Sequence, residues 1–299
     1  MTHRTPSTFL PWQTLTLAAC ALLLQACGGG GSGDAGTPVT SPSTISAATP
    51  DRLSYGRLSS FAITGTNLAS TVSFSATGCD GLAVLAGGSV TQQTVTCTPN
   101  QALSVRLAAS VGGSEIYNST ALAVPKPRVT LTTTAGSIVV DLEPGVVKAT
   151  VDNFLAYTNA GFFNGTIFHR VAPLNGAGNF IVQGGGFTGV SGNALTAQTG
   201  LRPAIALESN KGLSNLRGTI AMARTNLPDT ATAQFYFNTA ANTFLDYASA
   251  ASPGYAVFGR ITSDLAVIDA ISTVATGTVG GNGNVPVTDI VVTTAAQTL

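Results

Sequence analysis

Residues 168–187, FHRVAPLNGAGNFIVQGGGF, contain a single arginine, Arg170, in a mostly apolar stretch that includes three consecutive glycines. The glycines are not a phosphate-binding loop, because neither a Lys-Ser/Thr pair nor a helix pattern follows them. Gly176 and Gly178 are followed by Asn-Phe-Ile, which also fails the dinucleotide fingerprint. Since the stretch holds no carboxylate, its chemistry is that of one guanidinium beside amide and apolar side chains.

The rest of the composition excludes several other classes of site. The chain has 2 histidines, and only His169 lies beyond the N-terminal leader. A Ser-His-Asp triad or a His-rich zinc site is therefore not expected, and neither is any other metal or cofactor. The 13 basic residues balance the 13 acidic ones. A nucleic-acid partner is not expected either, because phosphate binding needs clustered Lys and Arg.

Rotation about the amide bond before a proline is a reaction that suits such a site. Its barrier of ~18–20 kcal/mol comes from amide resonance, and no covalent bond has to break. A cation that reaches the twisted imide nitrogen or its carbonyl favours the transition state over both planar ground states. Arg170 has the fixed charge and the forked donors for this role. The apolar neighbours would then hold the proline ring.

The elements that must position this stretch lie in residues 126–299. RVTLTTTAGSIVVDL predicts a hairpin, and KATVDNFLAYTNAGFF predicts an amphipathic helix that ends at Gly161. A second helix, SDLAVIDAIS, is expected to begin with Ser263 as its N-cap. Further strands are expected around residues 167–171, 180–183, 219–223, 234–238 and 255–261, with VTDIVVTT as the last. Many strands and two helices indicate a mainly β fold, a closed barrel capped at its ends.

A second, smaller domain is expected over residues 44–125. Short β-type runs such as SSFAITG and LSVRLAASV are separated there by Gly, Asn, Asp or Pro, which is typical of a small immunoglobulin-like β-sandwich. The proline-bearing VPKPR segment, residues 124–128, marks the boundary to the barrel domain.

The N-terminus is typical of an exported lipoprotein. Residues 1–26 hold His3, Arg4 and an apolar run too short to span a bilayer, which takes ~20 residues, and they read as a signal peptide. LQAC, ending at Cys27, resembles a bacterial lipobox, whose cysteine is lipidated; an ordinary signal with an incidental cysteine is the alternative. Residues 27–43 are Gly-, Ser-, Thr- and Pro-rich and predict a flexible linker. Gly28 after the cysteine favours the outer membrane, facing the periplasm.

In an exported chain, Cys79 and Cys97 are expected to form a disulfide. Both are equidistant from Gly88. A hairpin with a Gly87-Gly88-Ser89 loop would place them directly opposite each other. A bridge between two sheets is the alternative.

Several motifs in the barrel domain together resemble the cyclophilin-type peptidyl-prolyl cis-trans isomerases, especially the bacterial ones. They are FHRV, NFIVQGGGF, GTIAMAR, AQFYFN, FLD and YAVFGRI, in family order between residues 129 and 294. The resemblance implies an eight-stranded closed antiparallel barrel with two capping helices. It also implies isomerisation of X-Pro bonds in proline-containing polypeptides, here assisting the folding of exported proteins.

The resemblance assigns roles residue by residue. Arg170 matches the catalytic arginine, and Gln183 matches the glutamine that helps to hold it. The other matched positions lie along the substrate groove: the proline-pocket walls Phe180, Ile181, Tyr236 and Leu245, the substrate-pairing backbone at Ala223 and Arg224, and the groove residue Gln234. His169 is expected to be structural, because the family uses it as neither acid nor base.

Some positions depart from the family pattern. Phe244 stands where many eukaryotic members have tryptophan and Tyr255 where they have histidine, so weak cyclosporin binding is implied. Tyr236 stands where phenylalanine is commoner, which reads as a tolerated exchange. Leu174 to Asn179 form an insertion beside the groove. The insertion leaves a second function open, a non-catalytic module that binds proline segments or acts as a holdase. Nothing in the sequence requires more than a monomer.

Overall fold

A computed structural model describes residues 41–68, 71–100, 103–173 and 179–299. The signal peptide, Cys27, the linker up to residue 40 and residues 174–178 of the insertion lie outside the described residues. None of the helices in the described part is long and apolar enough to cross a membrane.

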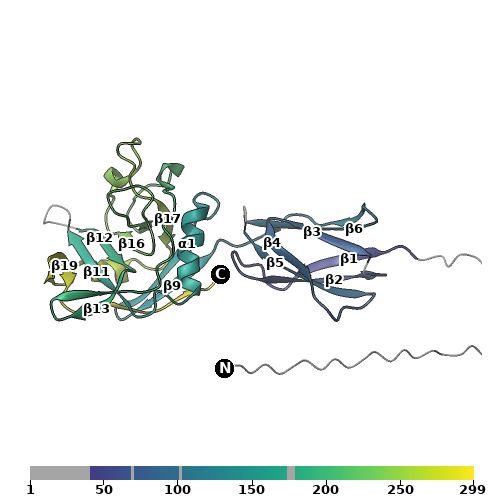
Figure 1. Cartoon of the computed structure of the whole chain (residues 1–299), viewed down its shortest axis with the longest axis horizontal. Coiled ribbons are helices and arrows are strands. Elements are labelled where there is room, and N and C mark those ends of the chain that lie inside the picture. Colours follow the sequence, from purple (N-terminus) through teal and green to yellow (C-terminus); the bar gives the residue numbers. More distant parts are fainter. Residues whose placement is uncertain (1–40, 69–70, 101–102, 174–178) are drawn as a thin grey trace, which may run out of the picture. The chain divides into compact units, whose positions relative to one another are not determined.

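The C-terminal part is a closed barrel of eight antiparallel strands, which confirms the expected fold class (Figure 1). Around the barrel the order is β10-β17-β15-β16-β12-β11-β20-β9. These strands are β9 (Arg128–Thr133), β10 (Gly136–Leu142), β11 (Thr166–Pro173), β12 (Asn179–Gly184), β15 (Thr219–Met222), β16 (Phe235–Asn238), β17 (Val257–Ile261) and β20 (Val291–Gln297). The strands expected from sequence therefore exist. Most ends shift by at most two residues, but β20 begins four residues after the start of VTDIVVTT and ends three residues beyond it.

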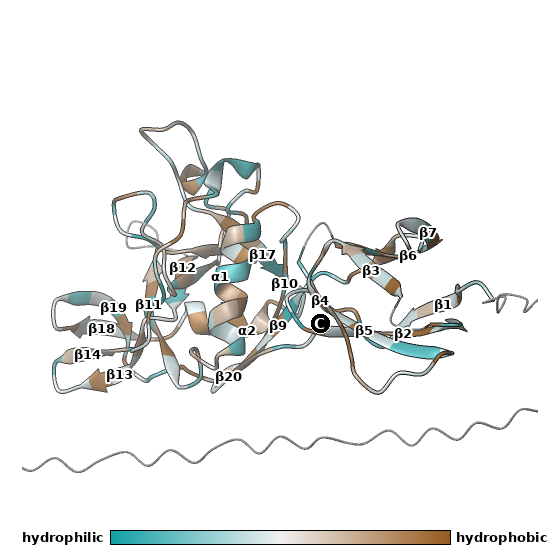
Figure 2. Ribbon diagram, turned by 45° about the vertical axis from the view of Figure 1, so that its right-hand side comes forward, coloured by the Kyte–Doolittle hydropathy of each residue, from teal (hydrophilic) through white to brown (hydrophobic). Residues whose placement is uncertain are grey.

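Two hairpins extend from the barrel beside β11, the strand that carries Arg170. They are formed by β13 (Phe187–Ser191) with β14 (Ala194–Ala197) and by β18 (Thr276–Val279) with β19 (Asn282–Pro286). The hairpins lie side by side (Figure 2), and the Gly280 backbone N–H donates to Asn193 Oδ1 over 2.9 Å. They border one side of the strand that presents the arginine.

The barrel is filled with aromatic rings, and helix α1 (Lys148–Asn159) contributes one of them. Val151, Phe154, Leu155 and Thr158 are buried, and their i, i+3, i+4, i+7 spacing places them on one face of the helix. The Phe154 ring centre lies 5.5 Å from that of Phe235 in β16. Packing of this face onto the barrel, rather than intrinsic propensity, therefore holds the helix.

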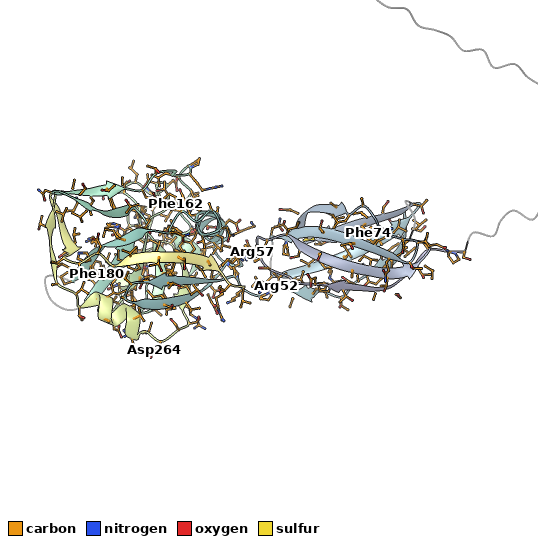
Figure 3. The ribbon with its side chains drawn as sticks, turned by 90° about the horizontal axis from the view of Figure 1, so that it is seen from below. Arg52, Arg57, Phe74, Phe162, Phe180 and Asp264 are labelled. Atoms are coloured by element: carbon orange, nitrogen blue, oxygen red, sulfur yellow. A yellow bond between two sulfur atoms is a disulfide. The ribbon has the colours of Figure 1, made fainter. Side chains whose placement is uncertain are left out.

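The predicted end of the first helix at Gly161 is confirmed, whereas the predicted N-cap of the second helix, Ser263, is wrong. Gly161 follows α1 with a φ of 70°, the left-handed conformation that ends helices. Helix α2 (Ala266–Ser272) begins three residues after Ser263, which does not cap it. The Ser263 hydroxyl accepts instead from the Val139 N–H, and Asp264, labelled in Figure 3, accepts the Ala266 N–H over 3.0 Å. Ser263 therefore ties the helix entry to β10.

The N-terminal part contains two antiparallel sheets (Figure 1). One has the order β1-β2-β5-β4, and in the other β3, β6 and β7 are joined by β8. Their bounds are β1 (Thr44–Pro50), β2 (Ser59–Thr66), β3 (Val72–Thr77), β4 (Cys79–Val84), β5 (Gln92–Pro99), β6 (Ser104–Val111), β7 (Ser114–Asn118) and β8 (Leu122–Ala123). Phe61, Val95 and Leu107 from both sheets are fully buried. Assignment to the immunoglobulin-like class stays a prediction.

The disulfide between Cys79 and Cys97 is present, with the Cα atoms 5.7 Å apart, and it joins neighbouring strands of one sheet. The expected register is wrong, because Cys79 lies opposite Pro99. The turn lies at residues 89–92, where the Ser89 hydroxyl accepts the N–H groups of Thr91 and Gln92. A bulge after Asp80 shifts the pairing again.

Candidate active site

The outer face of the barrel carries a row of four neighbouring side chains from four strands. Arg170 of β11 lies opposite Gln183 of β12, which lies opposite Tyr236 of β16, which lies opposite Ala221 of β15. Directly opposite residues of antiparallel strands project from the same face. Phe237, the next residue after Tyr236, is fully buried in the barrel, so the row itself faces outward.

A β-bulge in β11 sets the direction of the Arg170 side chain. The register of β11 against β12 shifts between Phe168, which pairs with Gly184, and Arg170, which pairs with Gln183. The extra residue is His169. Bulges of this kind redirect side chains and are frequent beside active sites. Here the shift puts Arg170 and Gln183 side by side.

The three glycines after Gln183 make room for close packing. A Cβ on Gly184 would lie 2.8 Å from the Phe168 ring, and a Cβ on Gly186 would lie 2.6 Å from Nε2 of Gln234. Gly185 has a φ of 82°, a backbone conformation that is strained for any residue with a side chain. The run therefore lets Gln234 reach the site.

A chain of two glutamines positions the guanidinium, since Gln183 bonds Arg170 and Gln234 bonds Gln183. Nη1 of Arg170 donates to Oε1 of Gln183 over 3.3 Å, and Nε2 of Gln183 donates to Oε1 of Gln234 over 2.9 Å. Within the described residues, Gln183 is the one hydrogen-bond partner of the half-buried Arg170 side chain. The other guanidinium N–H groups therefore remain for a substrate.

A cavity of about 300 Å³ lies beside Arg170, a volume at the lower end of the usual range for ligand sites. Its lining contains nine of the residues chosen from sequence: Arg170, Phe180, Ile181, Gln183, Ala223, Arg224, Tyr236, Leu245 and Tyr255. Ile181 and Tyr236 belong to a small hydrophobic cluster separate from the barrel interior. Six of the nine lining residues are apolar or aromatic, and Arg170, Gln183 and Arg224 supply polar groups to the same hollow.

Two predicted substrate residues lie next to this cavity rather than in its lining. Gln234 lines two neighbouring hollows instead, one with Thr225 and Thr230 and one with Phe187 and Asn282. Phe244 is 59% exposed. Its ring stacks on Phe180, labelled in Figure 3, with ring centres 5.8 Å apart.

The Arg224 side chain supports the cavity wall. Its Nε and Nη2 donate to the Gly254 carbonyl over 3.0 and 2.7 Å. Its Cζ lies 4.5 Å from the centre of the Tyr255 ring, within cation–π range. The Ala223 N–H donates to the Gln234 carbonyl, so it is occupied. The predicted pairing of a substrate with this segment would therefore have to use its remaining backbone groups.

His169 is buried beside the arginine. Burial lowers the pKa of its imidazole to about 4, and the positive charge of Arg170 contributes in the same direction. The ring packs edge-on against Phe187, with centres 4.7 Å apart. His169 is thus neutral at physiological pH, and its structural role stays a prediction.

The lowered pKa makes stability depend on pH. Because the folded pKa of about 4 lies below the ordinary 6.5, the unfolded chain takes up a proton first as the pH falls. We expect the free energy of unfolding to be ~2 kcal/mol lower at pH 5 than at pH 7. Urea unfolding of the wild type and His169→Gln at both pH values checks this, and an equal drop in the variant contradicts it.

Sequence reasoning missed a polar network behind the cavity. Asn215 is fully buried and accepts a hydrogen bond from the Tyr236 hydroxyl over 2.8 Å. Asn215 lies in a loop without a periodic pattern. The one feature of the sequence that indicated such a network was the hydroxyl of Tyr236, because a buried phenol needs a hydrogen-bond partner.

Comparison with known proteins shows the family to which the barrel belongs. The family model for "Cyclophilin type peptidyl-prolyl cis-trans isomerase/CLD" matches residues 128–297. Peptidyl-prolyl cis-trans isomerase A of Dickeya dadantii is 45% identical over 173 residues, 58% of this chain and 85% of the relative. Isomerase B of Escherichia coli is 42% identical over 166 residues, 55% of this chain and 95% of the relative. The chain belongs to the cyclophilin-type peptidyl-prolyl cis-trans isomerase family.

Proposed function

We propose that the barrel catalyses cis–trans rotation about X-Pro bonds and that Arg170 supplies the catalytic group. The observation that carries this proposal is the Arg170 guanidinium beside apolar and aromatic side chains in one cavity of about 300 Å³. The proline ring would occupy the cavity between Phe180, Ile181 and Leu245, with Tyr236 as the floor.

Arg170 would act by electrostatics alone. Its free N–H groups donate to the imide nitrogen or to the carbonyl as the bond twists and resonance is lost. Apolar neighbours strengthen this interaction by lowering the local dielectric. Gln183 and Gln234 hold the guanidinium ready, so little reorganisation accompanies the reaction. No proton is transferred and no covalent bond breaks, so the neutral His169 has no chemical part.

The test is a kinetic assay of the mature chain, residues 27–299, with a short X-Pro peptide. Spontaneous interconversion takes tens to hundreds of seconds at 25 °C, and we expect clear acceleration at catalytic protein concentrations. Peptide binding without acceleration would contradict the enzyme function and favour the clamp or holdase.

We further propose that the protein is a lipoprotein of the bacterial envelope, in the outer membrane and facing the periplasm, where it acts on exported chains. The lipobox-like LQAC before the flexible linker supports this location. The disulfide supports an oxidising compartment. The two N-terminal sheets would then form an immunoglobulin-like module between anchor and barrel. Phe244 in place of tryptophan supports weak cyclosporin binding, and we expect a monomer.

Replacing Cys27 tests the anchor. We expect the full chain made in a bacterial host to partition with membranes and to carry the mass of a lipid on Cys27. The variant Cys27→Ser should lose both properties, whereas Cys20→Ser should keep them, because residue 20 lies within the leader. Intact-protein mass spectrometry of the membrane extract decides the point, and an unmodified Cys27 contradicts the proposal.

A further inference from the structure

Tyr236 forms the floor of the proline cavity, and its hydroxyl points away into a buried polar network. Only 3% of the residue is exposed, and the hydroxyl donates to Oδ1 of Asn215 over 2.8 Å. Burial raises the pKa of this hydroxyl, so it remains a protonated donor. A buried phenol without a partner is costly, so the acceptor fixes where the ring lies.

Asn215 is itself held in one orientation. Its backbone N–H and its Nδ2 donate to Oδ1 of Asp246 over 2.7 and 2.9 Å, and the Ser214 hydroxyl donates to the other carboxylate oxygen. Because the carboxylate accepts from the amide NH₂, the amide oxygen must face Tyr236. Burial alone would raise the pKa of Asp246, but the hydrogen bonds from Ser214 and Asn215 outweigh it and hold the pKa below its usual value. The carboxylate is therefore ionised at neutral pH.

The same carboxylate also fixes a wall of the cavity. Asp246 directly follows Leu245, which lines the cavity at the end of a short 3-10 helix (Thr243–Leu245). The Leu245 carbonyl accepts the Tyr255 N–H over 2.9 Å. Gly254 packs against this segment so tightly that a Cβ there would lie 2.5 Å from the Leu245 oxygen. Movement of Asp246 would therefore move a wall residue directly.

Asn238 and Asn242 extend the network to a second wall. Asn238 Nδ2 donates to Oδ1 of Asn215 over 3.2 Å. Asn242 Nδ2 donates to Oδ1 of Asn238 and to the Phe180 carbonyl, both over 2.8 Å. The network thus reaches three lining residues, Tyr236, Leu245 and Phe180, without itself touching a substrate.

We propose that Asn215 and Asp246 are positioning residues, which fix the floor and walls of the cavity for the proline ring before a substrate binds. This inference rests on the proposed function. The ring is held alike in the cis, trans and twisted states, so losing the network weakens all three about equally. Such uniform loss raises KM and leaves kcat unchanged. Loss of Arg170, by contrast, would lower kcat.

The test is a set of four variants of the mature chain assayed with one X-Pro peptide. We expect Asn215→Ala to raise KM about tenfold with kcat within twofold of the wild type, and Tyr236→Phe to have a smaller effect of the same kind. In Asn215→Ala/Tyr236→Phe no unpaired hydroxyl remains, so KM should be no higher than in Asn215→Ala alone. The control Thr150→Val removes a buried hydrogen bond to Glu208, outside the network, and should leave KM unchanged.

The free energy of unfolding and the peptide Kd are measured for every variant. A wild-type KM in Asn215→Ala, or a raised KM in Thr150→Val at equal stability, would overturn the positioning role. A fall in kcat with unchanged KM would overturn it as well. If the wild type bound the peptide without acceleration, the proposed function would fail separately. The positioning role would then be tested by the peptide Kd, which should be about tenfold higher for Asn215→Ala than for the wild type.

Discussion

Arg170→Ala is expected to lower kcat/KM for X-Pro peptides by about 10²–10³-fold, the usual cost of removing one donor that stabilises a transition state. The lower kcat/KM should come from a lower kcat, with KM nearly unchanged. The other residues that line the cavity and the polar network behind it remain intact, so the ground state should still bind. Progress curves for peptide isomerisation, with peptide Kd measured alongside, separate the two effects.

Two further arginine variants sharpen this prediction. Arg170→Lys keeps the charge but loses the planar fork, so its activity should lie between wild type and alanine. Arg260→Ala removes an exposed arginine from β17 and should be fully active. Full activity in Arg170→Ala, or an equal loss in Arg260→Ala, would contradict the assignment of Arg170.

Phe154→Ala should lower the free energy of unfolding by about 3–5 kcal/mol, because it leaves a large cavity in a close-packed core. The Phe154 ring is fully buried, with its centre 5.0 to 5.5 Å from those of Phe163, Phe235 and Phe258. This one side chain therefore joins α1 to two barrel strands.

Urea unfolding of Phe154→Ala and of a matched control measures this effect. Leu201→Ala removes an apolar side chain that is 58% exposed and should change the free energy by no more than about 0.5 kcal/mol. A loss below about 1 kcal/mol in Phe154→Ala would mean that α1 contributes little to the barrel core.

The barrel and the cavity could be predicted because their signals are local and mutually consistent. The run Phe235-Tyr236-Phe237 is aromatic throughout, which is typical of a strand buried on both faces. The structure places Phe235 and Phe237 in the barrel core and Tyr236 in the smaller cluster at the cavity. The bulge at His169 changes the register of the strand pair, but Arg170 still lies in the strand predicted to carry it. Residues far apart, such as Phe180 and Leu245, were placed together by family motifs, because spacing alone does not bring them to one cavity.

The predictions that failed depended on competition between neighbouring groups. Ser263 looks like an N-cap, but its hydroxyl accepts from the Val139 N–H of another element. The two cysteines are equidistant from Gly88 in the sequence, but the turn lies at Ser89 and a bulge follows Asp80, so the strands pair in another register. Asn215 had no local signal, because its partners Tyr236 and Asp246 are distant in sequence and meet only in the folded barrel.

NMR exchange spectroscopy tests the central claim most directly, since it observes the cis and trans forms of one X-Pro peptide at equilibrium. With the wild-type mature chain at a small fraction of the peptide concentration, we predict exchange cross-peaks between the two forms within a second. Spontaneous exchange takes tens to hundreds of seconds and gives none on this timescale. With Arg170→Ala the peptide should still bind, but the cross-peaks should vanish. Binding by the wild type without exchange, or undiminished exchange with Arg170→Ala, would contradict catalysis by Arg170.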